Sequence, residues 1–248
     1  MLIGQLASDA KQAPPILHPA PEKSVSAPYS FRHGAFDITV LSDGFITIPQ
    51  DVLLTNGAPY EQAALLSRLD TVGDAVRPKA NIPALRTGAD LILIDIGSGN
   101  KYQPTDGRLA DDLAAAAIDP GAVTKVVFSH AHPDHIWATL DESGRLRFPN
   151  ATYYVGAAEW DFWTDPNFLT TMPSALHEFA RGAQRDLGAV RERAVMLQAG
   201  DEVVTGLQAL ATPGHTPGHL SFEVAGGDGL QITVDAANNE VVSFEHPD

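Results

Sequence analysis

Residues 129–135 read Ser-His-Ala-His-Pro-Asp-His and directly follow a short apolar run, 124–128, that is typical of a buried strand. Three imidazoles and a carboxylate within six residues are more than packing explains, because histidine is sparse in most chains. Pro133 argues against a regular helix or a central strand here. We therefore expect a loop at a strand end whose side chains converge on one point, as in a metal site.

The composition limits which ligands such a site can use. The 248 residues include nine His and no Cys, so imidazole and carboxylate must hold any metal. These ligands suit zinc, with iron or manganese as alternatives. The absence of Cys also excludes disulfides and cysteine nucleophiles.

The charge balance restricts the partners. Sixteen basic and 31 acidic residues give a formal charge of −15, which argues against nucleic acid. No apolar run approaches the roughly 20 residues of a membrane span. We expect a small-molecule substrate. The sequence does not decide between a monomer and a homodimer. Residues 1–35 lack an intact secretory signal, so the protein is expected in the cytoplasm, or in the periplasm or outside the cell if an export signal has been removed.

A second histidine cluster supports the first. Residues 212–219 read Thr-Pro-Gly-His-Thr-Pro-Gly-His, a turn that presents His215 and His219. Alone, this turn is equally typical of a structural loop. Asp235 then follows an expected strand at 231–234, although an Asp in that position is usually a turn or cap residue.

The rest of the chain is predicted to form one α/β domain, 36–248, preceded by an extended Pro-rich arm, 1–35. Apolar residues at three- and four-residue steps predict an amphipathic helix over 174–193. Further helices are expected near 59–69 and 107–117. Strands are expected at 36–41 and 45–48 around a turn at 42–44, and at 91–96, 124–128, 152–155, 202–211 (two), 220–225 and 230–234. The Gly-Gly-Asp-Gly turn at 226–229 predicts that the last two strands form a hairpin.

Together these motifs resemble the metallo-β-lactamase superfamily, whose HxHxDH motif matches at His130, His132, Asp134 and His135. The segment 158–163, Ala-Glu-Trp-Asp-Phe-Trp, resembles the methyl parathion hydrolase and lactonase branch. The resemblance implies an αββα sandwich of two mixed sheets flanked by helices, here incomplete at the C-terminus.

The resemblance also implies roles for the site residues. It implies that His130, His132 and His215 bind one zinc, that Asp134 and His135 bind a second, and that Asp235 bridges the two. Asp95 is expected to hydrogen-bond a ligand imidazole and fix its tautomer, and His219 is expected to lie beside the ligands rather than among them. The family's last ligand is a further His well beyond the bridging Asp, and His246, eleven positions on, comes early for it. We therefore expect a truncated chain with a weakened second site.

Aromatic residues near the first motif suggest a substrate pocket, although core packing explains them equally well. They are Trp137, Trp160, Phe162, Trp163 and Phe168.

These features predict a hydrolase in which a metal-bound hydroxide, oriented by Asp134 as the catalytic carboxylate, cleaves an ester, a lactone or an organophosphate triester. One alternative is a mononuclear iron enzyme of the sulfur-dioxygenase type on the same fold. Another is a catalytically silent metal-binding protein that lacks the last family ligand.

Overall fold

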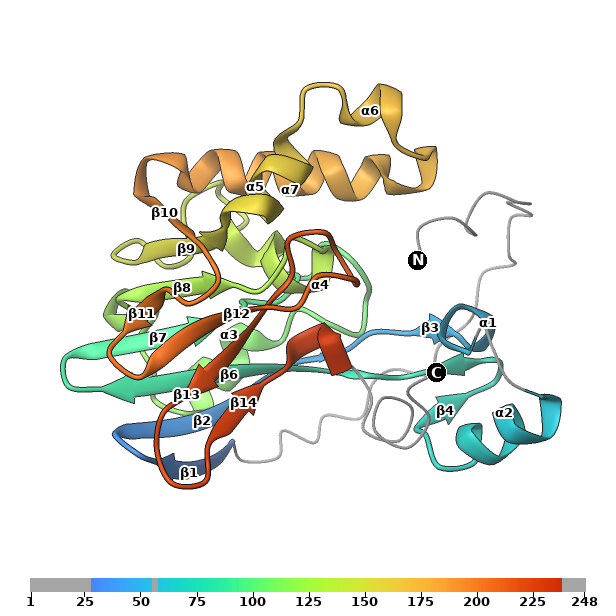
Figure 1. Cartoon of the computed structure of the whole chain (residues 1–248), viewed down its shortest axis with the longest axis horizontal. Coiled ribbons are helices and arrows are strands. Elements are labelled where there is room, and N and C mark those ends of the chain that lie inside the picture. The colour runs from blue at the N-terminus through green and yellow to red at the C-terminus, as the bar shows by residue number, and fades with distance from the viewer. Residues whose placement is uncertain (1–27, 55–57, 238–248) are drawn as a thin grey trace.

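Two β-sheets lie face to face in the computed structural model of this chain, which describes residues 28–54 and 58–237 (Figure 1). The larger sheet has seven strands in the order β1-β2-β6-β7-β8-β9-β10, and the smaller has four, β11-β12-β13-β14. A three-stranded sheet, β3-β5-β4, lies at one end of the molecule. No helix in the described residues combines the length and apolar character needed to cross a membrane.

The larger sheet is mixed, because its first strands pair antiparallel whereas β7 to β10 run parallel. Parallel neighbours need crossover connections, and these connections carry most of the helices. The strands are β1 (Tyr29–His33), β2 (Phe36–Phe45), β6 (Lys79–Thr87), β7 (Asp90–Ile94), β8 (Lys125–Phe128), β9 (Thr152–Gly156) and β10 (Ala194–Leu197). The helices are α3 (Leu109–Ala115), α4 (Pro133–Ile136), α5 (Ala157–Thr164), α6 (Phe168–Thr171) and α7 (His177–Val190).

The smaller sheet is entirely antiparallel, and its last two strands form the hairpin expected from the Gly-rich turn at 226–229. Its strands are β11 (Glu202–Val204), β12 (Leu207–Ala211), β13 (Leu220–Val224) and β14 (Leu230–Ile232). The end sheet and its helices comprise β3 (Ile48–Pro49), β4 (Thr71–Val72), β5 (Ala75–Val76), α1 (Gln50–Leu53) and α2 (Pro59–Leu66).

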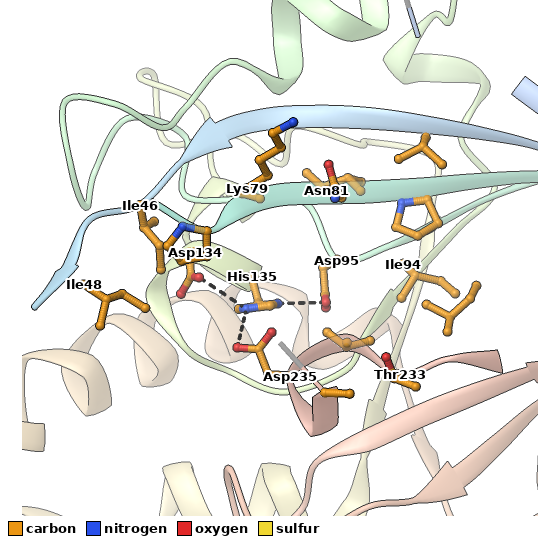
Figure 2. A pocket seen from close by; sticks show the side chains of 18 of the residues that line it. Ile46, Ile48, Lys79, Asn81, Ile94, Asp95, Asp134, His135, Thr233 and Asp235 are labelled. Atoms are coloured by element: carbon orange, nitrogen blue, oxygen red, sulfur yellow. Dashed lines mark hydrogen bonds and ion pairs between the residues drawn. The ribbon is translucent and has the colours of Figure 1, made fainter. Parts of the chain in front are cut away.

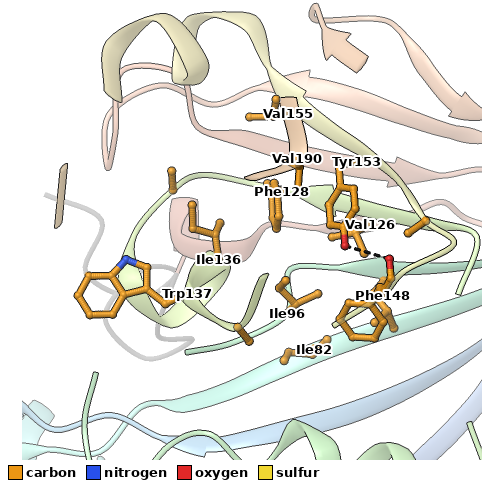
Figure 3. Packing of buried hydrophobic residues seen from close by; sticks show 14 of the residues in the cluster. Ile82, Ile96, Val126, Phe128, Ile136, Trp137, Phe148, Tyr153, Val155 and Val190 are labelled. Atoms are coloured by element: carbon orange, nitrogen blue, oxygen red, sulfur yellow. Dashed lines mark hydrogen bonds between the residues drawn. The ribbon is translucent and has the colours of Figure 1, made fainter. Parts of the chain in front are cut away.

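Two apolar cores lie on opposite faces of the larger sheet. One joins it to the smaller sheet, with Phe36, Ile92 and Phe222 fully buried between them. The other joins it to the helices and includes Val126, Phe128 and Tyr153, which Figure 3 shows packed together. The expected amphipathic helix is confirmed as α7, with the short 3₁₀ turns 174–176 and 191–193 at its ends. It buries Ala180, Ala183, Leu187 and Val190.

The described residues therefore show both sheets of the expected sandwich and a helical layer on the outer face of the larger sheet. Within these residues no helix covers the outer face of the smaller sheet.

The structure corrects three local predictions. The expected turn at 42–44 is a bulge inside the continuous strand β2, where buried Asp43 accepts hydrogen bonds from the backbone N–H groups of Ser98, Gly107 and Leu109. The domain begins before residue 36, because β1 pairs with β2. A short helix, α4, begins at Pro133, since proline is tolerated in the first turn, where the N–H group has no helical partner.

Candidate metal centre

Four connections bring the predicted site residues together at one edge of the two sheets. Asp95 follows β7, the HxHxDH segment follows β8, and His215 lies on the turn between β12 and β13. Asp235 lies in the 3₁₀ turn η6 (Val234–Ala237), three residues beyond the end of β14 rather than directly at a strand end. The backbone of Val234 has φ +49°, which is unusual for a β-branched residue and marks a tightly constrained turn.

Three imidazoles form the first ligand group. His130 Nε2 lies 3.1 Å from His132 Nδ1, which lies 2.9 Å from His215 Nε2. Nitrogens bound tetrahedrally to zinc at about 2.0–2.1 Å lie about 3.3 Å apart. The three nitrogens all lie within 4.8 Å of one another, so this donor set fits one tetrahedral ion.

A second group combines imidazole and carboxylate. His135 Nε2 lies 3.4 Å from Asp134 Oδ2 and 3.5 Å from Asp235 Oδ2, and Figure 2 shows the two carboxylates facing the ring. Asp235 Oδ2 also lies 3.2 Å from His215 Nε2 and 3.9 Å from His130 Nε2. One oxygen thus lies between the two groups, as a bridging ligand requires. The roles of these residues as ligands stay predictions.

Asp95 hydrogen-bonds His135 at Nδ1, the ring nitrogen that faces away from Asp134 and Asp235. Its Oδ2 lies 2.9 Å from His135 Nδ1 and also accepts from the Ser129 hydroxyl, while Oδ1 accepts from the Ser129 N–H. A proton on Nδ1 leaves Nε2 free to donate a lone pair to a metal, which is the usual tautomer of such a ligand. Asp95 has φ +61°, a left-handed conformation that Asp tolerates better than most residues.

Electrostatics keep the first group neutral. Burial, together with repulsion from neighbouring imidazoles, lowers the pKa of His130 well below its usual value and that of His132 to about 3. Burial also lowers the pKa of His215. Neutral imidazole is the form that binds metals.

The carboxylates of the second group favour a positive charge between them. Burial opposes a charge on His135, but Asp134, Asp235 and Asp95 outweigh it and hold the pKa of His135 well above its usual value. Burial favours the protonated carboxyl at Asp134 and Asp235, yet His135 reverses this effect and lowers the pKa of both. Three carboxylates therefore lie around the His135 ring, and two of them, Asp134 and Asp235, are on the Nε2 side where a cation would bind.

His219 lies beside the site but outside both groups. Its Nδ1 bonds the Thr212 hydroxyl at 2.8 Å, and its ring centre lies 5.1 Å from that of His130. In the described part of the chain, its buried Nε2 has no hydrogen-bond partner, and no bond joins it to a predicted ligand. The structure thus places His219 next to His130, and its role beside the ligands stays a prediction. His246 lies outside the described residues.

The five aromatic residues pack in or against the core on the helix side of the larger sheet, and none of them lines the cavity described below. Trp137 packs against Gly182 of α7, and Trp163 and Phe168 are stacked 5.3 Å apart and almost wholly buried. Trp160 and Phe162 pack against the same core. Only Trp163 approaches a predicted ligand, with its ring centre 5.6 Å from that of His132. Core packing therefore accounts for Trp137, Trp163 and Phe168, whereas Trp160 and Phe162 are partly buried, and a pocket role for these side chains stays a prediction.

A cavity of about 400 Å³ opens instead on the other side of the site, toward the end sheet (Figure 2). Asp95, Asp134, His135 and Asp235 line one end of it. Its remaining wall is mainly apolar, with contributions from Val40, Ile46, Ile48, Leu53, Val76, Ile94 and Ile232. No motif in the sequence marks these residues, because they come together only through the packing of distant strands.

Comparison with known proteins agrees with this geometry. A model of the metallo-beta-lactamase superfamily matches residues 80–231. The N-acyl homoserine lactonase AttM of Agrobacterium fabrum is 34% identical over 143 residues, which are 53% of this chain and 48% of that protein. The lactonase AiiA of Bacillus thuringiensis subsp. kurstaki is 26% identical over 134 residues, 53% and 46% of the two chains. The chain thus spans about half the length of the curated relatives it matches.

Two solved structures share the fold over most of the chain. AidC, a dizinc quorum-quenching lactonase, superposes with a TM-score of 0.80 and 26% identity, covering 89% of this chain and 78% of AidC. The hydrolase AbOPH of the beta-lactamase superfamily gives a TM-score of 0.79 and 26% identity, covering 91% and 79%. With its motifs, its sheets and the matched family model, the chain belongs to the metallo-beta-lactamase superfamily.

Proposed function

We propose that this chain is a zinc-dependent hydrolase that opens the ester bond of lactones, with N-acyl homoserine lactones as its substrate class. The observation that carries the proposal is the convergence of His130, His132 and His215 beside Asp235. Asp235 in turn lines one end of an apolar cavity together with Asp134 and His135. The lactonase names of the relatives support the choice of substrate.

Each ligand group has a distinct task in this proposal. His130, His132 and His215 would hold one ion, His135 and Asp134 would hold a second, and Asp235 would be shared between them. Divalent ions held in this way polarise a substrate carbonyl and lower the pKa of water towards neutrality. The protein's own contribution is to keep the three imidazoles neutral and the carboxylates ionised.

The cavity supports the choice of an acylated ring as the substrate. Its volume of about 400 Å³ lies in the range typical of small-molecule sites, about 300–1,000 Å³. A lactone ring at the carboxylate end leaves the apolar wall, including Ile46 and Ile48, for an acyl chain. Asp134 lines this cavity beside His135, where its carboxylate can accept a hydrogen bond from the attacking water.

The presence of two ligand groups favours a two-ion hydrolase over a mononuclear iron enzyme, because a single ion bound to the first group leaves Asp134 and His135 without a metal to bind. Elemental analysis of the purified chain separates these possibilities. We expect zinc at one to two equivalents, whereas one iron per chain points to the dioxygenase type and no bound metal to a silent protein.

The activity test measures release of the acid from N-hexanoyl homoserine lactone at constant pH, with paraoxon and p-nitrophenyl acetate as comparison substrates. Turnover should disappear after chelation and return with zinc. Zinc-loaded protein that leaves the lactone intact contradicts the proposed substrate class, and turnover that survives complete metal removal contradicts the mechanism.

A further inference from the structure

Glu159, in the first turn of α5, is fully buried, which is rare for a carboxylate unless its oxygens are satisfied. It lies outside both ligand groups, and the proposed chemistry gives it no task. Its surroundings therefore need a separate explanation.

Four donors occupy its two oxygens. Oε1 accepts from the Ala131 N–H at 2.9 Å and from Trp163 Nε1 at 2.6 Å. Oε2 accepts from the Thr216 hydroxyl at 2.7 Å and from the Gly218 N–H at 3.1 Å. An ionised carboxylate offers about four acceptor positions, so its capacity is filled. Burial raises the pKa of Glu159, and the four donors counter that effect by stabilising the ionised form.

Three of these donors belong to the two loops that carry the histidines of the first ligand group, and the fourth, Trp163, lies on α5 itself. Ala131 lies between His130 and His132, and Thr216 follows His215 directly. One carboxylate thus spans loops more than 80 residues apart in sequence and bonds each within one residue of a predicted ligand.

Backbone packing fixes the distance that Glu159 has to span. A Cβ added to Gly218 would lie 2.0 Å from the Glu159 backbone nitrogen, so the turn rests directly on the start of α5. Such a close approach requires glycine. The carboxylate therefore reaches both loops without an intervening water or side chain.

We propose that Glu159 is a positioning residue that sets the separation between the His130–His132 loop and the His215 turn, and thereby the affinity and geometry of the metal site. This inference rests on the proposed metal centre. It adds a residue that touches neither ion nor substrate and acts through the backbone of both loops.

The decisive variant is Glu159→Gln, which preserves shape. Three of the four donors, Ala131 N–H, Trp163 Nε1–H and Gly218 N–H, cannot become acceptors. A glutamine amide must therefore face at least one of them with its own N–H. Orienting its oxygen toward Ala131 and Trp163 leaves the Gly218 N–H opposed, which releases the turn that carries His215.

Two further variants interpret the result. Thr216→Val removes one bond to the same turn and leaves the carboxylate in place. Asp186→Asn is the matched control, because Asp186 is also a fully buried carboxylate but pairs with Arg185 on α7 and contacts neither loop.

The measurements are Zn²⁺ affinity by competition with a chromophoric chelator, the visible absorption of the Co²⁺-loaded protein, and thermal unfolding of the metal-free protein. We expect Glu159→Gln to weaken Zn²⁺ binding by about 10-fold or more, the range seen when supports of metal ligands are removed. The Co²⁺ absorption should change with it, Thr216→Val should shift both in the same direction by less, and Asp186→Asn should leave both unchanged.

Wild-type affinity and absorption in Glu159→Gln overturn the inference while the metal centre stands. The inference also fails if Asp186→Asn weakens Zn²⁺ binding equally, because the effect is then a general loss of stability. If Glu159→Gln does not fold, the Thr216→Val variant takes its place. Wild-type Zn²⁺ affinity and Co²⁺ absorption in Thr216→Val then contradict the inference. A wild-type chain that binds no Zn²⁺ removes the metal centre and the inference together.

Discussion

Replacing Asp95 by Asn tests the hydrogen bond that supports His135 in the second ligand group. In the structure Asp95 accepts from the Ser129 N–H, the Ser129 hydroxyl and His135 Nδ1. An amide oxygen can keep the bond to the Ser129 N–H, which cannot change its role, and the hydroxyl can rotate to accept from the amide nitrogen. The other amide N–H then points at His135 Nδ1, so a donor replaces the carboxylate acceptor there, whereas the Ser129 hydroxyl adapts by rotating.

The inverted contact moves the proton of His135. With an N–H opposite Nδ1, the neutral ring carries its own proton on Nε2, the nitrogen that faces Asp134 and Asp235. That nitrogen can no longer donate a lone pair to an ion. Loss of such a support typically costs 10–100-fold in metal affinity, about 1.4–2.7 kcal/mol. Folding should lose only about 1 kcal/mol, the net value of one hydrogen bond.

The assay is equilibrium dialysis against chelator-buffered Zn²⁺, followed by elemental analysis and lactone turnover. We expect the weaker-binding equivalent of zinc to be lost first in Asp95→Asn, with turnover falling in parallel. Asp112→Asn is the matched control, because Asp112 is a buried carboxylate that accepts from the Ser42 N–H and contacts no imidazole. Unchanged zinc stoichiometry and affinity in Asp95→Asn would refute the assignment of His135 as a ligand held by Asp95.

Three further experiments test the site, the core and the cavity, and the second of them compares two glycine substitutions. His132→Ala should abolish turnover and most zinc binding while the unfolding temperature of the metal-free protein shifts little, and turnover that persists rules out the proposed chemistry. Gly182→Ala should destabilise by about 1–3 kcal/mol in urea unfolding, because a Cβ there would lie 2.2 Å from Trp137 Nε1, whereas Gly188→Ala on the same helix meets nothing within 4 Å and should stabilise by about 0.4–1 kcal/mol. Equal effects of the two glycine changes contradict the packing of Trp137. Ile48→Trp should raise KM for a decanoyl lactone more than for a butanoyl lactone, because Ile48 lines the cavity, and equal KM values argue that the acyl chain binds elsewhere.

The ligand clusters could be predicted from the sequence because they are local. His130, His132 and His135 lie within one short segment after a strand, and their spacing already implies convergence. The helix at 174–193 and the hairpin around 226–229 follow from periodicity and glycine for the same reason, and both are confirmed. The predicted break at 42–44 was wrong, because a Ser-Asp-Gly turn signal also fits a bulge when a buried Asp satisfies neighbouring N–H groups.

What the sequence determined by itself is the chemistry of the site: which imidazoles and carboxylates are available, and that no thiolate competes with them. Only the tertiary structure decided which aromatic side chains face the core, where the cavity lies, and that Glu159 ties two distant loops together. The physical reason is that burial and hydrogen-bond partners depend on contacts between segments far apart in the chain, whereas a residue's type and spacing are properties of one segment.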